Sequence, residues 1–211
     1  MSQQQPRRAV DRLWKLENHH CRPHPAPAAV PTLSLAEKMK LISKSVFLRR
    51  FAPQGVALDS RYSPPQTLVF ERNSELRWSW EMPGRIKDVA RWITALVDAA
   101  RPDQKTYLYP RNGAWKSGDS MKLFQMAAIF SVYGLKLTGD EVVEAEEAER
   151  DAVESLFSLS LVHGGTVSDD IFLIPDHAKV ILYADHHEAV HADFGDAEFM
   201  NRYLPEIPKF A

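Results

Sequence analysis

The stretch Lys179–Phe194, KVILYADHHEAVHADF, decides how the C-terminal part of the chain folds. It begins with the β-branched and aromatic run Lys179–Tyr183 and continues into the polar residues 185–188. Apolar side chains then alternate with polar ones over residues 189–194, which is the period of a half-buried strand. The pattern predicts a strand, a four-residue turn and a second strand, with one face formed by Val190, Ala192 and Phe194.

The same letters contain His187-Glu188-Ala189-Val190-His191, which has the H-E-x-x-H spacing of zinc hydrolases. On a helix, the two histidines lie one turn apart and reach one zinc ion at about 2.0–2.1 Å, while the glutamate polarises the bound water. On a strand they are about 13 Å apart and cannot share an ion. Asp185 and Glu188 form a weak capping box that favours a helix, but no third zincin ligand follows. The sequence therefore favours the hairpin.

Further strands are predicted before this hairpin. Residues 171–174 complete a β-meander, and residues 106–109 and 135–138 form short strands. Residues 67–71 and 75–81 are predicted to pair as a hairpin. In its second strand Trp78 and Trp80 share one face, so they either enter the core or form a docking patch, since tryptophan is enriched at interfaces.

Helical spacing of apolar residues predicts five helices in the body of the chain. The first begins at the capping box Ser34-Leu35-Ala36-Glu37 and runs to about residue 50. The helix from residue 119 or 120 to about 133 is apolar on nearly every side, so we expect it to be central and buried. The remaining three are expected over residues 86–100, 146–161 and 197–204. The order of elements predicts an α+β class: a single mixed domain with antiparallel hairpins and a meander packed against several helices.

Residues 1–31 differ from this body in composition. They are basic and contain five prolines, which predicts an extended proline-rich N-terminal arm, 1–31, before a globular domain, 32–211. A metal site in the arm has no known ligand spacing to support it. Its candidate ligands would be His19, His20, Cys21 and His24.

The composition excludes several classes of protein. The 211 residues are 45% hydrophobic and 26% charged, with a net charge of −2, so no overall field selects nucleic acid or a membrane. One cysteine excludes an internal disulfide framework. The first residues have no apolar segment of a secretory signal, and the longest apolar run is shorter than the roughly 20 residues of a membrane span. We expect a cytoplasmic protein.

The segment Gly113–Ser120 resembles the spacing of a nucleotide-binding P-loop, but Asp119 stands where that motif has its lysine. A carboxylate there would repel phosphate. A turn followed by a helix cap at Asp119 or Ser120 explains the same residues, and we expect no cofactor.

The segment 140–154 holds eight acidic residues and one base, Arg150. Such a cluster could steer a basic partner, and no catalytic signature was found. We therefore expect a non-enzymatic protein-binding module, for example a bacterial toxin-neutralising (immunity) protein of unknown oligomeric state. The alternatives are a metal-dependent hydrolase with His187, Glu188 and His191, or a structural subunit that docks through its tryptophans. The predicted partner-binding residues are Asp140, Glu141, Glu144, Glu146, Glu147, Trp78 and Trp80.

Overall fold

The computed structural model describes most of the chain after residue 38. The described residues are 39–61, 67–71, 75–100, 105–111, 113–116, 118–136, 139–162 and 170–209. The arm 1–31, with its candidate metal ligands, lies outside this part of the chain, and so do the capping box at Ser34 and the turn 72–74.

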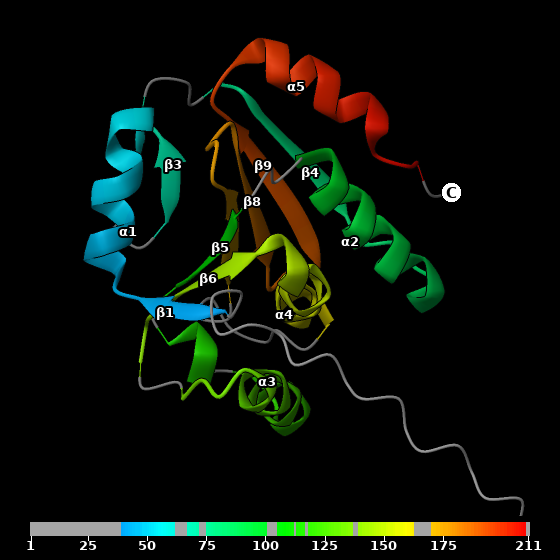
Figure 1. Ribbon diagram of the computed structural model, residues 1–211. Coiled ribbons are helices and arrows are strands. Elements are labelled where there is room, and N and C mark those ends of the chain that lie inside the picture. Colours follow the sequence, from blue (N-terminus) through cyan, green and yellow to red (C-terminus); the bar gives the residue numbers. More distant parts are fainter. Residues whose placement is uncertain are drawn as a thin grey trace, which may run out of the picture. The chain divides into compact units, whose positions relative to one another are not determined.

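A seven-stranded sheet forms the centre of the domain (Figure 1). Every strand pairs antiparallel with its neighbours. In spatial order the strands are β1 (Lys40–Ile42), β6 (Val142–Glu146), β5 (Lys105–Pro110), β7 (Ile171–Pro175), β8 (Val180–Asp185), β9 (Ala189–Phe194) and β4 (Arg77–Glu81). The last three strands in the chain are neighbours, as the predicted meander requires.

Helices and a small second sheet cover the two faces of this sheet. We call the side covered by α2 (Ile86–Ala100), α4 (Arg150–Val162) and α5 (Ala197–Tyr203) the helix face. The opposite side, the α1 face, packs against α1 (Lys44–Phe51) and the two-stranded sheet of β2 (Val56–Leu58) and β3 (Leu68–Phe70). Helix α3 (Ser120–Val132) packs beside α4. Short 3-10 helices span Ala52–Gln54, Ala114–Lys116, Glu147–Glu149 and Leu204–Glu206.

Alternation along the strands produces two separate cores. Leu182 and Val190 point to the helix face, whereas Ile181 and Tyr183 point to the α1 face. Because helices and antiparallel strands share one domain, the predicted α+β class is confirmed. None of the described helices combines the length and apolar character that crossing a bilayer requires.

The opening stretch forms the predicted hairpin. Strands β8 and β9 pair from Val180–Phe194 to Asp185–Ala189. The Glu188 N–H donates to the Asp185 carbonyl at 3.1 Å, and Glu188 takes a left-handed backbone conformation (φ 62°) that closes the turn.

The segments before the meander differ from prediction in their partners. Strands β3 and β4 do not form a hairpin with each other: β3 pairs with β2, and β4 pairs with β9. A buried carboxylate marks this arrangement, because Asp193 of β9 accepts a hydrogen bond from the Phe70 N–H of β3 at 3.1 Å. The predicted first helix is also wrong at its described start, since Lys40–Ile42 is a strand and Ser43 caps the helix.

Three predictions for the middle of the chain differ from the structure. The helix predicted from residue 146 begins at Arg150, since Val142–Glu146 is strand β6, and the described residues Leu135 and Lys136 form no strand. Helix α3 is not buried on all sides: Met126 and Phe130 enter the core, but Phe124 is 72% exposed and Val132 is 80% exposed. Helix α3 therefore has apolar side chains on two sides, and the rest of the domain covers only the side with Met126 and Phe130.

Candidate functional site

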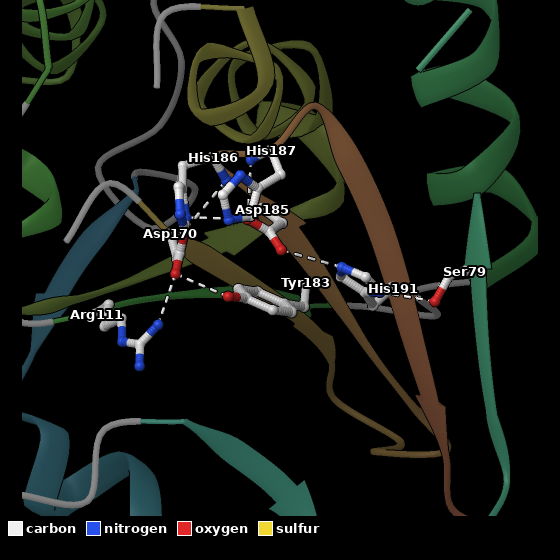
Figure 2. A network of polar contacts seen from close by, with 8 residues as sticks. All are labelled: Ser79, Arg111, Asp170, Tyr183, Asp185, His186, His187 and His191. Atoms are coloured by element: carbon white, nitrogen blue, oxygen red, sulfur yellow. Dashed lines mark hydrogen bonds and ion pairs between the residues drawn. The ribbon is translucent and has the colours of Figure 1, made fainter. Parts of the chain in front are cut away.

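A network of polar side chains occupies the end of the sheet where the β8–β9 turn lies (Figure 2). Its centre is Asp170, which is fully buried just before β7. This carboxylate accepts hydrogen bonds from the Arg111 guanidinium at 2.7 Å, the Tyr183 hydroxyl at 2.7 Å and the His186 ring at 2.8 Å. A buried carboxylate is costly unless it is paired and hydrogen-bonded, and Asp170 meets both conditions.

Each histidine of the network turns one ring nitrogen toward a carboxylate. Nδ1 of His186 lies 2.8 Å from Asp170 Oδ1 and 2.9 Å from Asp185 Oδ1. Nε2 of His191 lies 3.2 Å from Asp185 Oδ2. Because an ionised carboxylate only accepts hydrogen bonds, these two nitrogens are the ones that donate to the carboxylates.

The network continues to the edge of the sheet. The Ser79 hydroxyl lies 2.7 Å from Nδ1 of His191, its cross-strand neighbour, and the two groups share a hydrogen bond. Ser79, His191 and Asp185 therefore form a hydroxyl–imidazole–carboxylate line across β4, β9 and β8. Tyr183 stacks on Phe172 below this line, and burial raises the pKa of Tyr183, with the Asp170 charge adding to the effect.

A hollow of about 210 Å³ adjoins Ser79 and His191 on the α1 face. Two charge pairs line it: Arg61 with Asp59 at 2.6 Å, and Arg77 with Asp193 at 3.3 Å. Hydrogen bonds from Arg61 hold the pKa of Asp59 at about 2. Burial raises the pKa of Asp193, although the Phe70 N–H and Arg77 oppose that shift. Each arginine already faces a carboxylate, so the hollow is not a simple anion site.

The structure separates the two histidines of the H-E-x-x-H motif. His187 is exposed in the turn, whereas His191 lies on β9 and contacts Asp185 and Ser79. Within the described residues, the side chains that could jointly hold a metal ion are Asp185, His186 and His187, without His191. The hairpin prediction is confirmed, and the helical geometry that zincin chemistry needs is absent from this segment.

The predicted tryptophans lie beside a groove of about 1100 Å³ on the helix face. Trp78 is half exposed, at 50%. Trp80 is half-buried with its ring 6.1 Å from that of Tyr203, and the buried Trp92 of α2 also lines the groove. We call this feature the Trp groove; further lining residues are Met82, Ile207 and Pro208.

Strand β4 is the last strand of the sheet, so one of its edges is unpaired among the described residues. Phe194 donates its N–H to the Leu76 carbonyl, and Met82 donates its N–H to the Glu188 carbonyl. In an antiparallel pair the residues that bond to the partner strand alternate with residues that point away. Even-numbered residues of β4 therefore face β9, and the backbone groups of Arg77, Ser79 and Glu81 point outward.

Most of the predicted acidic residues have partners inside the domain. Asp140 accepts from the Gly113 N–H at 2.6 Å, and Glu141 accepts from the Gly139 N–H at 2.8 Å. Glu144 and Glu146 both bind the ammonium group of Lys105, at 2.6 and 3.0 Å. Glu147 is exposed. The acidic stretch is thus largely part of the sheet.

The described residues of the P-loop-like segment include a 3-10 helix, Ala114–Lys116, followed by the predicted cap at Asp119. The Asp119 carboxylate accepts a hydrogen bond from the Lys122 N–H at 2.8 Å and caps α3. Sequence reasoning did not find Asp170, Arg111 or Ser79. Their partners are distant in the chain, 59 residues for Arg111 with Asp170 and 112 for Ser79 with His191, and no local motif marks them.

No protein-family model, curated protein or solved structure matches this chain. Its function therefore has to be argued from its own residues.

Proposed function

We propose that the protein is a non-enzymatic binding module that holds an extended segment of a partner protein against β4. The observation that carries this proposal is the open edge of β4 next to the Trp groove, where Trp78 is 50% exposed. An exposed sheet edge supplies main-chain hydrogen bonds to an added strand, and neighbouring pockets select its alternate side chains.

The outward backbone groups of Arg77, Ser79 and Glu81 set the register of that added strand. Three residues with one N–H and one C=O each offer a short ladder, which a partner in extended conformation can pair along. The side chains of the partner would alternate between the Trp groove and the α1 face, since successive side chains of a strand point to opposite faces.

The lining of the Trp groove indicates the chemistry of those side chains. Its floor is aromatic, from Trp80 and Trp92, whereas its rim carries charges of both signs, Arg85, Asp88 and Lys209 among them. A buried aromatic floor with a polar rim is the usual anatomy of a protein interface. We infer a partner segment with apolar residues at alternate positions and mixed charge around them.

Two of the functions predicted from the sequence are compatible with this proposal, and for both of them β4 becomes the docking surface. A toxin-neutralising protein and a structural subunit both need a surface for another protein, and either could use β4. The acidic stretch supports a basic partner less strongly, because Glu144 and Glu146 are occupied by Lys105. The hydrolase alternative has lost the helix on which its two histidines would share an ion.

The test uses decapeptides selected from a random display library on the full-length protein. Three variants separate the edge from the groove: Trp78→Ala, Ser79→Pro and Ser79→Ala. Proline at position 79 removes an outward N–H that no ladder bond uses. Alanine there removes only the hydroxyl bond to His191 and is the matched control.

We expect selected peptides to bind the Ser79→Ala variant about as tightly as wild type. Trp78→Ala should weaken binding by about 30-fold, the loss of an interface hot spot, and Ser79→Pro by about tenfold, since roughly 1 kcal/mol or more goes with a backbone hydrogen bond. Peptides that bind Trp78→Ala and Ser79→Pro at wild-type affinity would place the binding surface elsewhere and overturn the proposal.

A further inference from the structure

Three consecutive residues at the β8–β9 turn bring metal-ligating atoms together. One ligand atom from each of Asp185, His186 and His187 lies within 4.8 Å of the other two. Asp185 and His186 are half-buried and His187 is exposed, so the cluster faces solvent on one side only. Two imidazoles and a carboxylate are the donor set that zinc and its neighbours among the divalent transition metals accept.

The buried Asp170 gives an independent reason to regard this cluster as a site. A histidine that binds a metal usually donates its second ring N–H to a carboxylate, which fixes the ring and its tautomer. His186 is placed for this arrangement, with Nδ1 at 2.8 Å from Asp170 Oδ1, so that Nε2 is the nitrogen that would bind an ion.

Asp170 is itself held in place. Arg111 and Tyr183 each bond it at 2.7 Å, and the His186 backbone N–H donates to it at 3.2 Å. A carboxylate so fully occupied and buried acts as a fixed support, and the His186 ring is positioned before any ion arrives.

We propose that the β8–β9 turn binds one divalent transition-metal ion through the Asp185 carboxylate, Nε2 of His186 and the His187 ring. Zinc–nitrogen bonds of about 2.0–2.1 Å place tetrahedral ligand atoms roughly 3.4 Å apart. Ligand atoms within 4.8 Å of one another need only small shifts to reach that spacing, and the exposed His187 side chain can rotate to supply them.

This site differs from the H-E-x-x-H site and does not depend on the proposed binding function. It includes His187 but not His191, whose two ring nitrogens already contact Asp185 and Ser79. The two sites therefore predict opposite results for a substitution at His186, which is a ligand of the turn site only, and that difference is the basis of the experiment.

The experiment titrates Zn²⁺, and separately Ni²⁺, into untagged full-length protein by isothermal calorimetry. Because the N-terminal arm contains its own potential ligands, each titration is repeated in a background where they are replaced by alanine: His19, His20, Cys21 and His24. His187→Ala tests the exposed ligand, Asp185→Asn tests the carboxylate, and His186→Gln tests the ring that only the turn site uses. His177→Gln is the control, because His177 lies before the start of β8 and bonds the Ala100 carbonyl. Circular dichroism verifies that every variant is folded.

We expect one ion per chain in the arm-substituted background. His187→Ala, Asp185→Asn and His186→Gln should each weaken binding by about tenfold or more, while His177→Gln should stay within about twofold of wild type. Absence of binding, or equal binding by wild type and His187→Ala, overturns the proposal. If His186→Gln binds as tightly as wild type while His187→Ala does not, the ion belongs to the H-E-x-x-H pair and the assignment is wrong.

Discussion

The acidic stretch 140–149 and strand β4 are the two regions that the sequence marks for partner binding, and they differ in how far the rest of the domain covers them. The acidic stretch runs into β6, which has neighbours on both sides, and its carboxylates meet Lys105. Among the residues that the structure describes, strand β4 has one neighbouring strand, and Trp78 lies half exposed beside a groove. Exposure depends on the position of a strand in its sheet more than on the polarity of its residues.

The difference teaches how a run of like charges can be structural. Glu144 and Glu146 lie two positions apart on a strand, so their side chains share one face. The neighbouring strand brings Lys105 opposite that face, 39 residues earlier in the chain than Glu144. Because Lys105 binds both carboxylates, the repulsion between Glu144 and Glu146 is offset by ion pairs that connect β5 with β6.

The largest effect should follow removal of that cation. Lys105→Met leaves Glu144 and Glu146 half-buried without a counter-charge, so we expect the free energy of unfolding to fall by about 2–3 kcal/mol, below the range for fully buried pairs. Urea denaturation measures it, with the exposed Glu147→Gln as control. A loss similar to that of the control would mean that the acidic stretch is a solvated surface after all.

The same ion pairs predict a pH dependence. The hydrogen bonds that Lys105 donates to Glu144 and Glu146 raise the pKa of Lys105 above its ordinary value of 10.5. A raised pKa in the folded state means that the stabilisation is complete below pH 10.5 and is lost as pH rises through the folded value. The stability difference between wild type and Lys105→Met should stay constant from pH 7 to about 10 and shrink above it, as denaturation curves at each pH would reveal.

A somewhat smaller effect is expected at the inner tryptophan of β4. Trp80 packs on Tyr203 and is only half-buried, so Trp80→Ala should lower the free energy of unfolding by about 2 kcal/mol, less than for a fully buried tryptophan. Thermal unfolding monitored by circular dichroism provides the measurement. An unchanged melting temperature would indicate that the groove floor contributes nothing to the fold.

Trp78, the outer tryptophan, should contribute little to stability and more to peptide binding. Trp78→Ala removes a half-exposed side chain, and we expect a stability loss of only about 0.5 kcal/mol, as for ordinary surface substitutions. Its main consequence is the loss of peptide affinity described above. Comparison of Trp78→Ala with Trp80→Ala in one denaturation series tests this directly; a larger loss for Trp78 would make it a core residue.

The smallest effect concerns the exposed acid. Glu147→Lys should change stability by less than about 0.5 kcal/mol. We also expect the rate at which a β4-binding peptide associates with this variant to be nearly the same at 0.1 M and at about 1 M salt, a range over which charge steering becomes screened. Stopped-flow fluorescence of a labelled peptide gives that rate, and a strong salt dependence that Glu147→Lys removes would restore the acidic stretch as a steering surface.

Local patterns predicted the elements whose partners are close in the chain. The meander and the helix over 86–100 follow from period and turn residues alone, and so does the H-E-x-x-H segment as a hairpin. The pairing of β4 with β9, more than 100 residues later, had no local signal, and the alternation of Trp78 and Trp80 was compatible with either partner.

The site was predictable only in part for the same reason. Trp78 and Trp80 stand out by residue type, and His187 by its motif. Asp170 acquires its role from Arg111, Tyr183 and His186, which reach it from two strand ends and a turn. A lone aspartate before an apolar run carries no mark of that convergence.

The hydrogen bond from Ser79 to His191 has a practical consequence for anyone who studies this protein in solution. It couples an imidazole ring to the very strand whose outer edge is open, on the face opposite the Trp groove. A chain that adds to β4 alters the surroundings of Ser79, and the ring signals of His191 in a proton–nitrogen spectrum should register that change. The molecule thus contains a native spectroscopic probe for occupancy of its own edge, at a residue whose side chain need not touch the incoming chain at all.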